Sequence, residues 1–176
     1  MTDDPRYPIG RFSAPGMQDE LRVISWRRDI IEVPVKLRVA VTGLDDGQLD
    51  TPYRDGGWTV RQVVHHLADS HLNAYCRFKL ALTEDNPVIK PYLEARWAEL
   101  ADSRTAPIGP SLALLEGLHR RWGVLLESLT HADLDRTFFH PEQQTAVPLW
   151  RTMALYSWHG KHHTAHITSL RARRGW

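Results

Sequence analysis

The chain has 176 residues, 42% of them hydrophobic, which is enough for one domain over residues 1–176 with a buried core and too many for a disordered chain. Its 22 lysines and arginines almost balance its 21 aspartates and glutamates, so the net charge of +1 argues against a nucleic-acid partner. Because no run approaches the roughly 18 apolar residues of a membrane span and no apolar signal segment opens the chain, we expect a cytoplasmic protein that does not enter a membrane.

The first part of the chain predicts an irregular arm followed by a helix. Residues 1–16 contain three prolines and two glycines, which break regular structure. Over residues 18–41, apolar residues recur at helical spacing. Pro34 lies inside this stretch, and we expect it to kink the helix or to begin a new segment. The residues that follow, 45–47, read Asp-Asp-Gly and predict a turn.

The second predicted helix has a well-defined start. Thr59 and Gln62 form the S/T-x-x-E/Q capping pattern at the end of a loop. From there, apolar residues recur at helical spacing over residues 60–82. Two prolines in residues 86–91 then interrupt the chain, and residues 93–100 predict a short helix.

The C-terminal half predicts two more helices with a hairpin between them. Periodic leucines indicate a helix over residues 112–129. Two short β-prone pieces flank residues 141–144, which predicts a small β-hairpin. The last helix is expected to begin near Pro148, because proline is favoured in a first turn. It should continue to about Arg174, with Gly175 as a stop.

These elements predict an all-α protein with at most one short β-hairpin. Four long helices joined by loops of unequal length are typical of an up-and-down or crossover four-helix bundle. Such bundles often hold metal ions between facing helices, through side chains that point inward.

The single cysteine and the basic C-terminus are interpreted as structural. Cys76 has no partner for an internal disulfide and lies in a helical stretch, so we expect a buried thiol. Arg171, Arg173 and Arg174 are expected to complement the negative end of the last helix rather than to bind phosphate.

Histidine is concentrated in two short segments. Of the 10 histidines, four lie in residues 159–166 and three in residues 65–71. His159 and His163 are four residues apart, so on a helix both imidazoles lie on one face, one turn apart. This is the spacing with which one helix offers two nitrogen ligands to one metal ion. Apolar residues along the same stripe indicate that this face points inward.

A third ligand must come from another helix, because a catalytic zinc ion usually has three protein ligands and one open position. The second predicted helix offers three histidines. His71 lies close to the apolar centre of that helix, whereas His66 lies about a third of a turn away. A site at the mouth of a bundle would favour the flanking position. Periodicity therefore leaves His66 and His71 as alternatives, and it ranks His65, on the opposite flank, below both.

Several segments carry a more specific signal. The longest is residues 49–71, which reads LDTPYRDGGWTVRQVVHHLADSH. The others are Tyr7-Pro-Ile-Gly-Arg-Phe12, Trp158-His159, His162-His163 and Gly175-Trp176. With these motifs the chain resembles, along nearly its whole length, the YfiT-like proteins of the DinB superfamily, which are regarded as metal-dependent hydrolases.

The resemblance implies a DinB-like four-helix bundle, a homodimer and a set of metal ligands. These ligands would be His66, His159 and His163, holding one divalent transition metal ion per chain, so the resemblance selects His66 over His71. Gly160 departs from the family pattern, in which we expect a polar residue such as serine after the Trp-His pair. A glycine within a helix costs about 1 kcal/mol relative to alanine, and here it is interpreted as permitting the close approach of another helix.

Three neutral imidazoles leave a bound cation its full charge, so the expected chemistry is Lewis-acid activation. A metal-bound water acting as the nucleophile would make the protein a hydrolase of a small molecule. The same site can activate a low-molecular-weight thiol of the bacillithiol type, which would make the protein an S-transferase. A further alternative is a non-catalytic metal-binding module of a stress response. Zinc is the first metal expected and nickel the second, because imidazole suits both.

The sequence assigns no catalytic residue besides the metal ligands. Asp69 lies within one turn of His66, where a carboxylate can orient the imidazole or accept a proton. A solvated aspartate is the favoured interpretation, so the general base stays unassigned.

Overall fold

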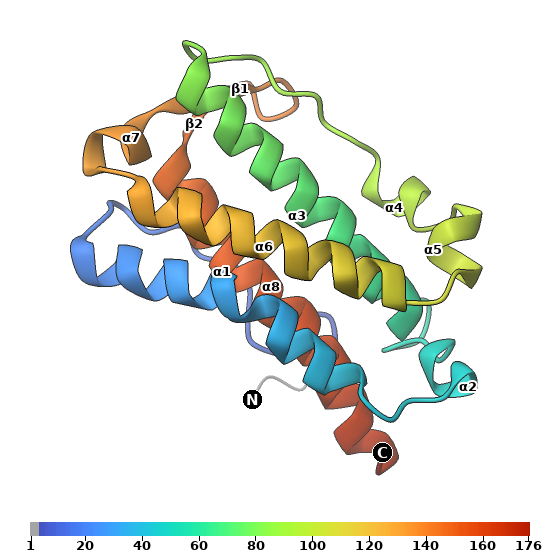
Figure 1. Ribbon diagram of the computed structural model, residues 1–176. Helices are drawn as coiled ribbons and strands as arrows, with labels where there is room; N and C mark the ends of the chain where they lie inside the picture. Colours follow the sequence, from blue (N-terminus) through green and yellow to red (C-terminus); the bar gives the residue numbers. More distant parts are fainter. Residues whose placement is uncertain (1–3) are drawn as a thin grey trace.

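Four long helices packed side by side form the body of the molecule, in a computed structural model that describes residues 4–176. They are α1, Glu20–Val41; α3, Val60–Thr83; α6, Gly109–Ser128; and α8, Leu149–Arg174. Helices α1 and α3 each pack against both α6 and α8, which confirms the predicted four-helix bundle (Figure 1). Among the described residues, no helix has the length and apolar character needed to cross a membrane.

The chain between α6 and α8 forms the predicted hairpin. Strand β1, Thr137–His140, pairs antiparallel with β2, Thr145–Pro148. Pro148 is the N-cap residue of α8 and does not belong to its first turn. At the other end of α8, Gly175 has a φ of 71° and ends the helix as predicted.

Four short helices connect the long elements. They are α2, Asp46–Leu49; α4, Glu94–Trp97; α5, Ala101–Thr105; and α7, His131–Asp135. The prediction of a turn at residues 45–47 was wrong, because Asp45 and Gln48 form a reciprocal capping box that begins α2. The short helix predicted over residues 93–100 is confirmed as α4, which is shorter, whereas α5 and α7 were not predicted.

Helix α1 has apolar residues on two sides. Val23 and Ile30 are buried in the core, whereas Leu21 and Val35 are exposed. The apolar periodicity that predicted this helix therefore mixed its buried face with an exposed one. Pro34 does not begin a new segment, because α1 continues through it, and Figure 1 shows the helix curving along its length.

Helix α3 is deeply buried where it begins. Thr59 and Gln62 form the predicted capping box, and residues 60–68 are all buried. The second half of the helix reaches the surface, where Cys76 is exposed. The prediction of a buried thiol was therefore wrong.

The irregular N-terminal arm lies against α8. Of the predicted arm, residues 1–3 lie outside the described residues, and residues 4–16 contain no helix or strand. The Trp158 indole N–H donates to the Gly10 carbonyl at 3.3 Å, and Phe12 packs on the same indole. The arm therefore covers the part of α8 that carries the histidines.

The core consists of two apolar clusters, one towards each end of the bundle. The first includes Phe78, Trp122 and Met153, and the second includes Leu67, Leu115 and Ile167. On α3, α6 and α8, buried histidines lie between the residues of the two clusters: His71, His119 and His163. A polar layer of imidazoles therefore crosses the middle of the bundle.

Gly160 permits a close contact between α8 and α1, as the sequence predicted. A Cβ atom added at Gly160 would overlap the side chain of Val33. We expect Gly160→Ala to lower the free energy of unfolding by about 1–3 kcal/mol, because one of the two helices must move. Chemical denaturation measures this change.

Gly117 provides the matched control, because it lies within α6 and an added Cβ would meet open space. Gly117→Ala should stabilise the protein by up to about 1 kcal/mol through helix propensity alone. If the two substitutions had the same effect, the steric explanation of Gly160 would fail.

Candidate metal centre

The structure brings His66, His159 and His163 together. His66 comes from α3, and the other two come from consecutive turns of α8. One ring nitrogen from each residue lies within 4.8 Å of the other two. The closest pair is His66 Nε2 and His159 Nε2, which are 3.2 Å apart. His66 and His163 are buried, and His159 is partly exposed at the edge of a cavity.

The spacing of these nitrogens suits a tetrahedral transition-metal site. Zinc–nitrogen bonds of about 2.0–2.1 Å place two ligand nitrogens roughly 3.3 Å apart, close to the observed separation of His66 and His159. No other His, Cys, Asp or Glu among the described residues belongs to this group. The donor set of three imidazoles fits zinc or nickel, and it leaves room for a further ligand that is not protein.

Burial keeps the three imidazoles neutral, as metal ligands must be. It lowers the pKa of His66 to about 4. Burial, and next the positive charge of a neighbouring imidazole, lower the pKa of His159 and His163 well below the ordinary histidine value. At neutral pH all three rings therefore offer lone pairs. The Nδ1 atom of His163 is buried without a hydrogen-bond partner in the structure.

The other two histidines of α3 do not join this group. His71 is fully buried, and its Nε2 lies 3.3 Å from Nδ1 of His159, so it contacts a member of the group from outside. His65 faces Ser111 and the Ala106 carbonyl, at 2.7 and 3.2 Å. Apolar periodicity had left His66 and His71 as alternatives for the third ligand. In the structure, His66 lies with His159 and His163 of α8.

His162 and His166 form a second group with His163. The imidazole of His162 stacks on Trp158, and Nε2 of His166 donates to the Arg6 carbonyl at 3.2 Å. Neither residue belongs to the group of His66 and His159. A fourth protein ligand would favour a structural metal, and the three-histidine group has none among the described residues.

A cavity of about 340 Å³ opens beside the histidines. Apart from His159, His162 and His163, its lining includes Ser70, Arg77, Tyr92, Glu94, His140 and Tyr156. An adjacent cavity of about 220 Å³ shares three of these residues and adds apolar ones: Phe12, Phe138 and Val147. These residues come from α3, α8, the hairpin, the arm, and α4 with the chain before it, so no single motif could reveal them.

Among the described residues, two carboxylates have raised pKa values, and only one of these two lines the cavity. Burial raises the pKa of Glu94, which lies in the cavity wall. Burial, and next the charge of Asp102, raise the pKa of Asp69 to about 6. Asp69 is not among the residues that line the cavity. Glu94 is therefore the better-placed proton acceptor, and the sequence had not singled it out.

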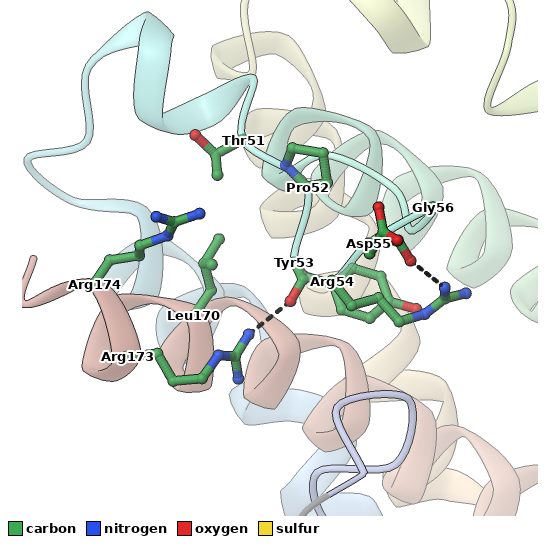
Figure 2. A pocket seen from close by; sticks show the side chains of 9 residues that line it. All are labelled: Thr51, Pro52, Tyr53, Arg54, Asp55, Gly56, Leu170, Arg173 and Arg174. Atoms are coloured by element: carbon green, nitrogen blue, oxygen red, sulfur yellow. Dashed lines mark hydrogen bonds between the residues drawn. The ribbon is translucent and has the colours of Figure 1, made fainter.

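A larger cavity, of about 550 Å³, has no histidine in its lining and lies between the loop before α3 and the end of α8 (Figure 2). Arg173 lines it and donates to the Tyr53 carbonyl at 2.6 Å, and Figure 2 shows this bond. Arg171 donates to the carbonyls of Ala40 and Thr42, where α1 ends. The basic C-terminus thus binds carbonyls of neighbouring segments, and it attaches the end of α8 to α1 and to the loop.

Known proteins resemble this chain over almost its full length. The family model described as the DinB superfamily matches residues 30–167. A protein of Geobacillus thermodenitrificans (strain NG80-2), named "Putative metal-dependent hydrolase", is 58% identical over 176 residues, 99% of each chain. A Bacillus mycoides (strain KBAB4) protein named in the same way is 56% identical over 173 residues, 98% of this chain and 99% of the relative. YfiT from Bacillus subtilis, described as "a probable metal-dependent hydrolase with an unusual four-helix bundle topology", matches with a TM-score of 0.95 and 52% identity over 98% of both chains.

Proposed function

This chain belongs to the DinB superfamily, and we propose that it is a metal-dependent hydrolase acting on a small molecule. The observation that carries the proposal is the group of three neutral imidazoles, two of which, His159 and His163, line a cavity. The group has no fourth protein ligand among the described residues. His66, His159 and His163 would hold one zinc or nickel ion. When bound, such an ion supplies the Lewis acidity that brings the pKa of a water molecule towards neutrality.

The other residues of the cavity have roles that follow from their chemistry. Glu94 can accept a proton, because partial burial raises its pKa and so makes its carboxylate a stronger base. The guanidinium of Arg77 can bind an anionic group of the substrate. The Tyr156 hydroxyl lies 3.1 Å from the Ser70 hydroxyl, so these two groups are held together at the wall. The volume of about 340 Å³ suits a small molecule and not a polymer.

The second candidate function is transfer of a low-molecular-weight thiol. A metal ion that acidifies water also acidifies a bound thiol. This alternative is supported by the adjacent, more apolar cavity, which shares Arg77, His140 and Tyr156 with the first. Two adjacent cavities would give room for a thiol and its electrophilic partner.

Metal analysis and an activity screen test the proposal. The purified chain should contain close to one equivalent of zinc or nickel, and hydrolysis of amide or ester substrates should stop after chelation and return when metal is added. A protein without bound metal that gains no metal on dialysis would contradict the proposal. If turnover requires a thiol, the S-transferase is the correct function and the hydrolase proposal is wrong.

We also propose a homodimer, as the resemblance implied. An exposed apolar stripe on α1 supports it, including Val35 and Val39, each 68% exposed. Light scattering should give the mass of a dimer, and Val35→Glu with Val39→Glu should give a monomer, because burying two carboxylates is costly. Val88, 69% exposed elsewhere on the molecule, is the control, and Val88→Glu should remain dimeric. A wild-type monomer would contradict this prediction.

A further inference from the structure

A chain of hydrogen bonds leads from His159 across the whole bundle. Nδ1 of His159, on α8, lies 3.3 Å from Nε2 of His71 on α3. Nδ1 of His71 lies 2.9 Å from Nε2 of His119 on α6. Nδ1 of His119 lies 2.7 Å from the carbonyl oxygen of Ile30 on α1. Each of the four long helices contributes one group, and the chain lies in the polar layer between the two apolar clusters.

The donor and the acceptor of each hydrogen bond in this series follow from its last group, the Ile30 carbonyl. The Ile30 carbonyl can only accept, so Nδ1 of His119 carries a hydrogen atom and donates. A neutral imidazole has one N–H and one lone pair, so Nε2 of His119 accepts from Nδ1 of His71. By the same reasoning, Nε2 of His71 accepts from Nδ1 of His159. The hydrogen atom of His159 is therefore on Nδ1, and the lone pair is on Nε2.

This is the arrangement that a metal ligand needs. Nε2 of His159 is the atom that lies 3.2 Å from Nε2 of His66, within the three-histidine group. We propose that His71 and His119 are positioning residues, which fix the tautomer and the ring orientation of His159 so that its Nε2 lone pair points to the metal. The inference rests on the proposed function, because it assigns to these two residues a role towards that metal.

Packing supports a positioning role because neither ring can turn freely. His71 is fully buried and His119 is 2% exposed. The two rings stack with centroids 4.9 Å apart, and Trp122 meets both of them edge-on. A purely structural contact in the middle of an apolar core would need no polar atoms, whereas here every nitrogen of the two rings is paired. Through this series of hydrogen bonds, the backbone of α1 fixes the position of the His159 ring.

Replacing His119 tests the proposal through metal affinity, measured on the full chain by competition between the protein and a chromogenic chelator for zinc. His119→Met keeps an apolar filling but removes both hydrogen bonds. It should weaken zinc binding by about 10-fold, the lower end of the loss for a direct partner of a ligand, because His119 acts through His71. His119→Gln can donate to Ile30 and accept from His71, so it should stay close to wild type. His65→Met is the matched control, because His65 is also buried and hydrogen-bonded to a carbonyl, but it does not belong to the hydrogen bonds that lead from His159 to Ile30.

The outcomes separate the inference from the proposed function. If wild type does not bind zinc, the proposed function fails. If wild type binds zinc and His119→Met binds it equally well, or if His119→Met and His65→Met lose equal affinity, the positioning role is overturned. Nitrogen-15 NMR of the metal-free protein reads the tautomers directly, without any metal. A hydrogen atom on Nδ1 of His159 and of His71 is the expected result, and a hydrogen atom on Nε2 of either ring contradicts the proposal.

Discussion

Replacing His163 by alanine should weaken zinc binding by about 100-fold or more and remove metal-dependent activity. Four-ligand zinc sites bind with roughly 10–16 kcal/mol in total, which corresponds to about 3 kcal/mol for each ligand. A loss of that size is about two orders of magnitude in affinity. His163 is also one of only three protein ligands proposed here, so its loss leaves too few to hold the ion in place.

His162→Ala is the control for this substitution. His162 is the neighbouring residue on α8, is also buried, and lies in the second histidine group but not in the first. It should keep zinc affinity within a few-fold of wild type. If His162→Ala lost as much zinc affinity as His163→Ala, the ion would belong to the second group, to which both residues contribute. Circular dichroism of both variants establishes whether the helices are retained.

The same experiment distinguishes an enzyme from a non-catalytic metal-binding module. If the metal serves catalysis, His163→Ala stays folded and wild type keeps its helices after chelation. If the metal is structural, chelation itself unfolds wild type, because metal-binding energy is then folding energy. The two apolar clusters, which are complete without any metal, lead us to expect the first result.

The local sequence determined much of the fold. The capping pattern of Thr59 and Gln62 placed the start of α3 at the correct residue, and the glycine after Arg174 placed the end of α8. The four-residue spacing of His159 and His163 was enough to put both on one inward face. These predictions succeeded because each depends on interactions within one helix, which sequence spacing describes well.

Features that depend on the packing of distant segments could not be predicted. The helical wheel of α3 places His71 near the apolar centre and His66 about a third of a turn away. Only the position of α8 decides which of them faces His163. In α1, exposed Leu21 and buried Val23 are equally apolar, so periodicity could not tell the two faces apart. His119 lies in a leucine-rich stretch without any ligand spacing, and its contact with His71 exists only in the folded bundle.

Acid should unfold the metal-free protein at a pH well above the ordinary carboxylate range. The histidine layer and the histidines beside it have lowered pKa values. Burial lowers those of His66, His119, His162 and His166 to about 4, and it lowers those of His71, His159 and His163 well below the ordinary histidine value. In the unfolded chain the same side chains have pKa values near 6.5. As the pH falls below about 6.5, the unfolded state therefore binds protons that the folded state does not.

The sign follows from this difference in proton binding. The contribution of the neutral histidines to the free energy of unfolding is fully present above the unfolded pKa of about 6.5. It decreases as the pH falls from about 6.5 to about 4, and it is absent below the folded pKa. For His66 alone, a pKa shift from 6.5 to about 4 corresponds to roughly 3 kcal/mol, at about 1.4 kcal/mol for each unit. Two residues of this kind are comparable to the whole stability of an ordinary domain, roughly 5–15 kcal/mol. The midpoint of acid unfolding should therefore lie between pH 4 and pH 6.5.

Circular dichroism during acid titration, with and without zinc, measures this transition. Zinc binds only neutral imidazoles, so saturating zinc should stabilise the folded state and move the midpoint to lower pH. His162→Phe keeps a ring to stack on Trp158 and removes one titrating group. It should reduce the slope of stability against pH by up to about 1.4 kcal/mol per pH unit, the value for one proton. A stability that stays constant between pH 7 and pH 4.5 would show that the layer is accessible to protons in the folded state and would contradict the prediction.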